Sequence, residues 1–539
     1  MTGSTSRILR EVHGCLPTLA NGRKGQALQH FGPMVLATQS DPEDHFRTDH
    51  LRSNLASRSV RGGAVTLVAQ VFRFVISIGA TAILARLLVP QDFGLIGMAA
   101  AITGFISMFR DLGLSQATIQ RDRVTHADVN ALFWLNMGVS SGLALVTMLL
   151  APLLAWFYGE PRVLGVTIAL GAGFFFGGVA VQHQALLDRQ MRFTIRSVID
   201  VCSLALGAIA GIGTALLGAG YWALVIQALV TALVSAIGLW IWSPWRPGKP
   251  AWSPAARSMV GFGGHVTGFQ VLNYVSRNID NLLIGRVWGA VSLGLYTRAY
   301  TLLMLPIRQV NAPLASVAQP ALGRLRHEPE KYRTVYLRVL EKIALLTMPG
   351  VAYLIATSDW IIRVVLGPGW SGAAPIFTWL GIAALVQPVA NTTGWLYVSQ
   401  ERGRDMFRWG LIGSLISVAA IIAGLPWGAL GVAAAYGVTD LLIKTPMLFW
   451  YIGRTGPIRT IDFYRAMAIP TLASAATMGS VLLLRHFVTF QAPLLGLFIS
   501  SALALCATML ALVVTGPGRA ALLDLRRFGT LLRTRGAQA

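Results

Sequence analysis

Polar side chains recur at helical spacing within three otherwise apolar stretches of the sequence. They are Gln70, Arg73 and Ser77 in the first stretch, Gln270, Asn273, Arg277, Asp280 and Asn281 in the second, and Arg298, Thr301 and Arg308 in the third. Residues three, four or seven positions apart share one face of a helix, so each set forms a polar stripe. Guanidinium groups bind phosphate and carboxylate oxygens through forked hydrogen bonds, and amides bind hydroxyl groups. The stripes therefore predict a binding surface for an anionic, hydroxyl-rich substrate.

The elements that carry these stripes are expected to lie in a membrane. Of the 539 residues, 54% are hydrophobic and 12% are charged, whereas a soluble domain carries roughly 25% charged residues. So few charges cannot cover a water-facing surface of this size. This composition excludes an ordinary soluble enzyme, a disordered tail and a fibrous protein. We expect an all-α polytopic membrane protein, because helices satisfy their own backbone hydrogen bonds in lipid.

Hydrophobic segments of spanning length follow one another from residue 63 onward. Fourteen are expected, at 63–85, 93–109, 131–156, 163–187, 198–217, 221–243, 261–285, 291–318, 337–357, 372–397, 407–424, 428–452, 463–484 and 492–515. Most Lys and Arg residues fall in the connections on one side of these segments. The opposite side carries Arg86, Arg162, Arg286, Arg363 and Arg485. Under the positive-inside rule, this bias predicts a multi-pass protein with both termini in the cytoplasm.

Arginines within a membrane restrict what the stripes can face. An arginine at mid-membrane costs on the order of 3 kcal/mol, so it needs a carboxylate, water or a substrate nearby. In a structural interpretation, Arg277 pairs with Asp280, and Arg73 contacts helix dipoles or carbonyl groups. In the other interpretation, the stripes line a cationic cavity between two lobes. Arg73, Arg277, Arg298 and Arg308 together outnumber Asp280, and this excess of positive charge favours the cavity.

A repeat with an offset of 200 residues indicates two related halves. The matched positions include Gln70 and Gln270, Arg86 and Arg286, Gly94 and Gly294, and Leu95 and Leu295. The two copies lie six segments apart, so both copies have the same orientation. We expect two parallel six-helix lobes around a central cavity plus two C-terminal helices. The expected domains are a disordered cytoplasmic extension (1–59), an N-lobe (60–245), a cytoplasmic linker (246–258), a C-lobe (259–455), two extra helices (456–516) and a basic cytoplasmic tail (517–539).

The sequence has no pattern for covalent chemistry or for a cofactor. There is no G-x-x-x-x-G-K-[ST] motif for ATP, no Ser/His/Asp set and no pair of carboxylates in the predicted outer loops. Cys15, Cys202 and Cys506 form no CxxC pair, so we expect neither a metal site nor a disulfide framework. The chain is therefore expected to be a transporter rather than an enzyme, with no cofactor or bound metal.

Three segments resemble one family of membrane proteins. They are residues 82–98 (AILARLLVPQDFGLIGM), 111–137 (DLGLSQATIQRDRVTHADVNALFWLNM) and 279–300 (IDNLLIGRVWGAVSLGLYTRAY). These motifs are similar to those of the polysaccharide transporters, or Wzx-type lipid-linked oligosaccharide flippases. Their superfamily also contains multidrug antiporters and lipid II flippases. The resemblance runs from about residue 60 to residue 455, and more loosely to residue 515. The N-terminal extension departs from the family pattern, and no fixed family signature assigns a role to the arginines.

The resemblance implies a role in the synthesis of exopolysaccharide, capsule or O-antigen. A flippase of this family moves polyprenyl-pyrophosphate-linked oligosaccharide repeat units across the bacterial inner membrane by alternating access. Its partners would be the lipid-linked substrate, membrane lipids and a polysaccharide polymerase with its export machinery, and no nucleic acid. Two alternatives stay open. A multidrug antiporter of the same superfamily would favour acidic cavity residues, and the short outer loops disfavour a membrane-embedded polymerase or glycosyltransferase.

Overall fold

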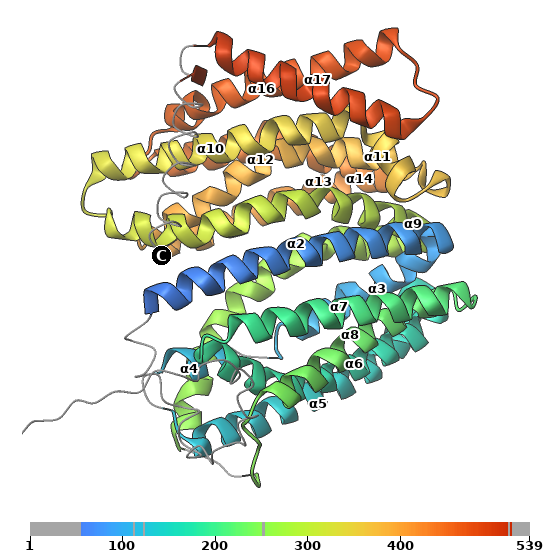
Figure 1. The fold of residues 1–539 in the computed structure, drawn as a ribbon, viewed down its shortest axis with the longest axis vertical. Helices are drawn as coiled ribbons and strands as arrows, with labels where there is room; N and C mark the ends of the chain where they lie inside the picture. The colour runs from blue at the N-terminus through green and yellow to red at the C-terminus, as the bar shows by residue number, and fades with distance from the viewer. Residues whose placement is uncertain (1–54, 111–113, 122–123, 251–253, 516–517, 520–539) are drawn as a thin grey trace, which may run out of the picture. The chain divides into compact units, whose positions relative to one another are not determined.

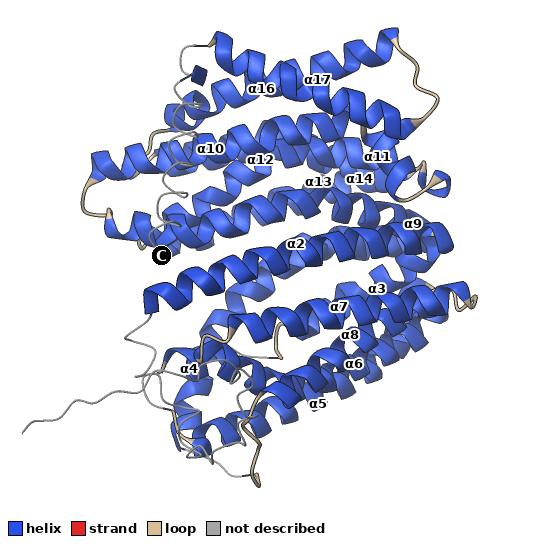
Figure 2. Cartoon of the chain, in the orientation of Figure 1, coloured by secondary structure: helices blue, strands red, loops and turns tan. Residues whose placement is uncertain are grey.

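The computed structural model of the chain describes residues 55–110, 114–121, 124–250, 254–515 and 518–519 (Figure 1). Within these ranges the secondary structure is helical and no strand occurs (Figure 2). Most of the predicted extension at 1–59 and of the predicted tail at 517–539 lies outside the described residues. Those two domain assignments stay predictions, as do the boundaries of the other four expected domains.

Seven helices form the described part of the N-lobe. They are α2 (Leu55–Leu87), α3 (Pro90–Ser107), α4 (Leu114–Gln120), α5 (His126–Tyr158), α6 (Arg162–Arg189), α7 (Phe193–Leu216) and α8 (Trp222–Trp242). α5 packs against α6, α7 packs against α8, and α2 packs against α7 (Figure 1). Gly178 allows the first of these contacts, because a methyl group there would lie 2.5 Å from Ser140 Cβ. A small residue thus lets two helices approach closely, as is common in membrane proteins.

Local sequence signals set the ends of α5. The Thr125 hydroxyl accepts a hydrogen bond from Asp128 N at 3.3 Å, and Asp128 Oδ2 accepts one from Thr125 N at 3.2 Å. This reciprocal capping satisfies backbone N–H groups that have no partner within the helix. At the other end, Gly159 has φ 65°, the left-handed conformation that commonly ends a helix. Capping residues in the sequence therefore account for both boundaries.

The C-lobe begins with α9 (Pro254–Arg324), which is two helices joined by a turn. Gly289 between them has φ 75° and ψ −175°, a backbone conformation that glycine adopts without strain. The chain turns back there, and the Asp280 carboxylate consequently lies 2.8 Å from the Tyr296 hydroxyl. A continuous helix would separate residues 16 positions apart by about 24 Å. The predicted spans 261–285 and 291–318 are therefore distinct helices.

The remaining helices complete the C-lobe and the two additions to it. They are α10 (Pro329–Ala356), α11 (Ser358–Val365), α12 (Ala373–Ser399), α13 (Gly403–Gly424), α14 (Gly428–Thr439), α15 (Thr445–Gly453), α16 (Thr460–Phe487) and α17 (Pro493–Val514). A π-helical turn at Asp440–Lys444 joins α14 to α15. α16 packs against α10 and α17 (Figure 1). The last two helices are the predicted C-terminal pair.

Each of the fourteen predicted spans coincides with a helical segment, and eleven described segments are long and apolar enough to cross a membrane. Three differences explain why there are eleven such segments and fourteen predicted spans. α3 is not among the eleven, and its first turn contains the polar residues Gln91 and Asp92. α9 contributes one segment, Asn278–Gln309, and segment Gly403–Gly453 contains two predicted spans. The predicted fold class, an all-α polytopic membrane protein with two lobes and two extra helices, is confirmed.

Candidate functional site

The N-lobe and the C-lobe meet where α3 crosses the second part of α9. A methyl group on Gly94 would lie 1.8 Å from the carbonyl oxygen of Ala290, and one on Gly294 would lie 1.9 Å from that of Pro90. In the 200-residue repeat, Gly94 corresponds to Gly294 and Pro90 corresponds to Ala290. Each glycine therefore contacts the counterpart of the residue that the other glycine contacts, and such an exchange is the signature of a two-fold relation. The glycine match of the sequence repeat thus marks the place where the two lobes touch. We call this contact the glycine crossing.

The matched arginines of the repeat also bridge the lobes. Arg86 Nη2 donates a hydrogen bond to the Val364 carbonyl oxygen at 2.7 Å. Arg286 lies over the Phe157 ring, 5.8 Å from the ring centroid. Each arginine therefore contacts the opposite lobe. These contacts lie at the end of the helices that the charge bias places outside, which we call the outer end, and they join the lobes there.

A tryptophan strengthens this junction at the outer end. Trp370, in the turn before α12, donates a hydrogen bond from Nε1 to the Ala85 carbonyl oxygen at 2.7 Å. The same indole packs edge-on against Phe93, with ring centroids 5.2 Å apart. Trp370 is 1% exposed, so its hydrogen bond is shielded from solvent. In this conformation the lobes are therefore closed against each other at the outer end.

Gln70 and Arg308 lie where α2 comes close to α9. The Gln70 side-chain amide donates a hydrogen bond to Gln309 Oε1. Gln70 is 16 residues before Arg86, or about 24 Å along α2, so this contact is far from the outer end. Arg308, the residue before Gln309 on α9, is exposed. Ser77 is half-buried two turns further along α2.

Arg73 has a carboxylate partner that sequence analysis did not assign. Its Nη1 lies 3.1 Å from Asp200 Oδ2 on α7, and Arg196 Nε lies 3.4 Å from Asp200 Oδ1. Both guanidinium groups contact this one carboxylate, and a second carboxylate, Asp188, lies near Arg196. The Arg73 side chain keeps 36% of its surface exposed. Arg73 therefore anchors α2 to α7 and still has donors available to an anion.

Asp280 is held by groups of its own helical hairpin. Its carboxylate accepts hydrogen bonds from the Tyr296 hydroxyl at 2.8 Å and from Asn281 N at 2.7 Å. Positions 280 and 296 are equally distant from position 288, next to the turn at Gly289. A helical hairpin that turns at this point brings the side chains at positions 280 and 296 together. Their equal distance from the turn is the sequence signal that identifies Tyr296 as a partner of Asp280. Asp280 is thus satisfied by neutral donors within the described residues.

Arg298 lies at the contact between the lobes, beside the glycine crossing. Its guanidinium group stands over the Phe93 ring of α3, 4.8 Å from the ring centroid. Its Nε is buried and has no hydrogen-bond partner within the described part of the chain, and none of the ion pairs found there includes it. A ring contact offsets part of the cost of desolvating a guanidinium group, at about 0.5–2 kcal/mol. Arg298 is therefore suited to receive an anionic ligand.

Three predicted site residues cannot be placed. The side chains of Gln270, Asn273 and Arg277 lie outside the described residues, so their roles, and the alternative pairing of Arg277 with Asp280, stay predictions. Within the described ranges, no group of three His, Cys, Asp or Glu residues is close enough to hold a metal ion. The described donors are guanidinium, amide and hydroxyl groups, which bind oxygen-rich ligands without covalent chemistry.

This fold and this site define a multi-pass membrane protein in which arginine and amide side chains lie where two related lobes meet. The chain belongs to the polysaccharide biosynthesis protein family. The family profile matches residues 83–375, which is more than half of the 539 residues. The matched range contains the glycine crossing as well as Asp280, Arg298 and Arg308.

Known proteins are similar over most of the chain. The lipopolysaccharide biosynthesis protein WzxC of Escherichia coli K12 is 24% identical over 78% of this chain and 83% of its own length. The teichuronic acid biosynthesis protein TuaB of Bacillus subtilis 168 is 26% identical over 79% of this chain and 89% of its own. The solved structure of the lipid II flippase MurJ, in an inward closed conformation, has a TM-score of 0.68 and 14% identity over 83% of this chain and 98% of its own. This last likeness establishes the fold.

Proposed function

We propose that the protein moves a polyprenyl-pyrophosphate-linked oligosaccharide across the bacterial inner membrane during synthesis of a cell-surface or secreted polysaccharide. Family membership supports a role in polysaccharide synthesis, and the likeness to the structure of a lipid II flippase supports the two-lobed membrane fold. The single observation that carries the substrate class is Arg298, whose guanidinium group has no carboxylate partner among the described residues. A pyrophosphate supplies the anionic oxygens that such a group binds.

The closed outer end supports a direction of entry. The glycine crossing, Arg86 and Trp370 hold the lobes together there, so the substrate enters between the lobes from the cytoplasmic side. Its sugar hydroxyls contact amide and hydroxyl groups such as Gln70, and its pyrophosphate contacts Arg298 or Arg308. The polyprenyl tail stays in lipid and passes between α2 and α9. Separation of the glycine crossing then opens the outer side.

We further infer a topology and a partner. Both termini lie in the cytoplasm, and residues such as Glu160 lie outside, as the charge bias predicts. The polymerase that consumes the repeat unit then meets its substrate at the outer face. The chain itself binds and reorients the lipid-linked unit, and it breaks no bond.

Deletion of the gene tests this function against multidrug export. We expect loss of the surface polysaccharide and accumulation of lipid-linked repeat units at the cytoplasmic face, both reversed by the wild-type chain. A multidrug antiporter predicts normal polysaccharide and increased sensitivity to cationic dyes. Normal polysaccharide in the deletion strain, with dye sensitivity, would reject the flippase.

A further inference from the structure

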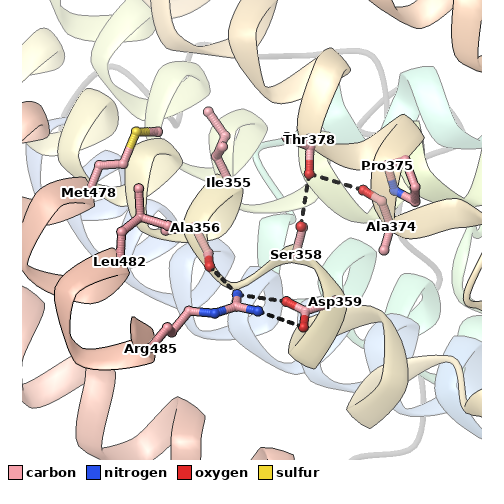
Figure 3. Close-up of a pocket in the computed structure, with 10 residues that line it drawn as sticks. All are labelled: Ile355, Ala356, Ser358, Asp359, Ala374, Pro375, Thr378, Met478, Leu482 and Arg485. Carbon is pink, nitrogen blue, oxygen red and sulfur yellow. Dashed lines mark hydrogen bonds and ion pairs between the residues drawn. The ribbon is translucent and has the colours of Figure 1, made fainter. Parts of the chain in front are cut away.

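A hollow of about 610 Å³ lies at the outer end of the C-lobe, between α16 and helices α10, α11 and α12 (Figure 3). Its walls are largely apolar and include Ile355, Pro375, Met478 and Leu482. Leu482 keeps 50% of its surface exposed, so the hollow is open to its surroundings. These residues lie within three turns of the ends of their helices. The hollow therefore opens where the hydrocarbon core meets the headgroup layer.

An arginine–aspartate pair forms the polar rim of this hollow. Arg485 on α16 donates two hydrogen bonds to the Asp359 carboxylate on α11, each 2.8 Å long (Figure 3). Arg485 Nη1 also donates to the Ala356 carbonyl oxygen. The guanidinium group lies over the Trp360 ring, 4.5 Å from the ring centroid. The rim is thus rigid, electrically neutral and placed at the depth where tryptophan side chains gather in membranes.

These contacts use N–H groups on Nη1 and Nη2 of Arg485. They leave free the edge of the guanidinium group that is formed by Nε and Nη2. Arginine carries five N–H groups. The bonds to Asp359 use one N–H on Nη1 and one on Nη2, and the bond to Ala356 uses the second N–H on Nη1. The Nε–H and the second Nη2–H have no partner within the described part of the chain, and they point in the same direction. Such a fork binds two phosphate oxygens at once.

We propose that this hollow binds a phosphatidylethanolamine molecule of the outer leaflet. One acyl chain lies against Met478 and Leu482, and the phosphate accepts hydrogen bonds from the open edge of Arg485. The ammonium group lies beside Asp359, whose side chain keeps 48% of its surface exposed and whose oxygens can accept further hydrogen bonds. Because the arginine–aspartate pair carries no net charge, the rim matches a zwitterionic headgroup. A primary ammonium group can donate to Asp359, whereas the quaternary ammonium of phosphatidylcholine cannot.

The N-lobe provides a matched control for this site. Arg162 also forms two hydrogen bonds with one carboxylate at the outer end, from Nε and Nη2 to Glu160, at 2.8 and 2.9 Å. The bond from Arg162 holds the pKa of Glu160 below its ordinary value. Here the carboxylate occupies the same edge of the guanidinium group that is open in Arg485. Arg162 therefore shares the charge pair but lacks a fork for phosphate.

Lipid retention by the purified full chain tests the proposal. The protein is delipidated in detergent, supplied with phosphatidylethanolamine, phosphatidylglycerol or phosphatidylcholine, and analysed by native mass spectrometry. We expect preferential retention of phosphatidylethanolamine. Arg485→Lys keeps the charge beside Asp359 but lacks the fork, and Leu482→Trp fills the hollow. Each should weaken phosphatidylethanolamine binding about tenfold, and Arg162→Lys should bind as the wild type does.

Two results would overturn the proposal. One is equal retention of the three lipids, or a preference for phosphatidylglycerol. The other is unchanged phosphatidylethanolamine binding in both Arg485→Lys and Leu482→Trp. Arg485→Lys acts on binding of the headgroup, and Leu482→Trp acts on binding of the acyl chain. If one variant fails to fold, the other still tests the proposal. Glycan translocation plays no part in this readout, and the lipid site is therefore tested independently of the proposed function.

Discussion

The arginines of the site differ in their surroundings. An arginine with a carboxylate partner in the protein has a structural role, whereas one without such a partner is suited to bind a ligand. Arg73 shares the Asp200 carboxylate with Arg196, so its charge is partly neutralised within the protein. Arg298 has the Phe93 ring beside it and a buried Nε without a partner in the described residues. A cation within a membrane that has no counter-charge is costly, and a bound anion offsets that cost. Arg298 is therefore the residue at which substitution should affect transport most directly.

Replacing Arg298 with glutamine should abolish most transport. We expect at least about a tenfold loss of polysaccharide export, because a hydrogen bond to a charged group contributes about 1.5–3 kcal/mol. Arg298→Lys should retain part of the activity, since the charge remains while the planar fork is lost. Export is measured per unit of membrane-inserted protein, with Arg162→Gln as a control at the outer end. Normal export by Arg298→Gln would remove this residue from the binding site.

Arg73 and Asp200 allow the two roles of an arginine to be separated. Arg73→Gln leaves Asp200 with Arg196, so we expect near-normal protein level but reduced export. The double variant Arg73→Gln/Asp200→Asn also removes the charge of the carboxylate that Arg73 contacts, and export should stay low if Arg73 binds substrate. Protein level and export are measured in both variants. Full export by the double variant would assign Arg73 a structural role alone.

At the scale of helices, the glycine crossing closes the outer end, and its two glycines occupy matching positions of the sequence repeat. Gly94 and Gly294 bring the backbones of α3 and α9 into direct contact. Alternating access requires this contact to form and to separate, because it lies between the lobes at the closed end. A side chain at either glycine would meet backbone atoms, which cannot rotate away.

Gly94→Ala and Gly294→Ala should therefore hold the lobes apart at the outer end. We expect each variant to reduce export at least about tenfold, since a methyl group cannot fit against a carbonyl oxygen without a backbone shift. Gly138→Ala is the matched control, because nothing lies within 4 Å of the position that its methyl group would take. Alanine there should be neutral or stabilise its helix by up to about 1 kcal/mol. Equal effects of the three substitutions on export would show that the crossing has no special role.

The helices of this protein were predictable from sequence, and the partners of their polar side chains were not. Lipid requires long apolar helices, so hydropathy located all fourteen spans. The match between Gly94 and Gly294 was visible in the repeat, but their mutual contact depends on the crossing of two helices distant in sequence. Asp200 as a partner of Arg73 depends on how α2 and α7 rotate against each other. Periodicity places a residue on a face of its helix but does not say which helix that face meets.

Over the whole molecule, the charge bias predicts one orientation in the membrane. Glu160 lies in the loop between α5 and α6 at the outer end. Glu401, whose side chain keeps 70% of its surface exposed, lies between α12 and α13 at the other end. Cys202 and Cys506 are exposed and are replaced first, together with Cys15. A membrane-impermeant thiol reagent should then label Glu160→Cys in intact cells and Glu401→Cys after lysis. The opposite pattern would invert the topology and the proposed direction of transport.

Leaflet translocation of a defined substrate tests the central claim most directly. The purified chain is reconstituted into liposomes with a fluorescent polyprenyl-pyrophosphate-linked oligosaccharide, and the fraction accessible from outside is followed over time. We predict that the wild-type protein equilibrates the substrate between leaflets, and that Arg298→Gln and Gly94→Ala do so at least about tenfold more slowly. Translocation by the folded wild-type protein that is no faster than in protein-free liposomes would contradict this account.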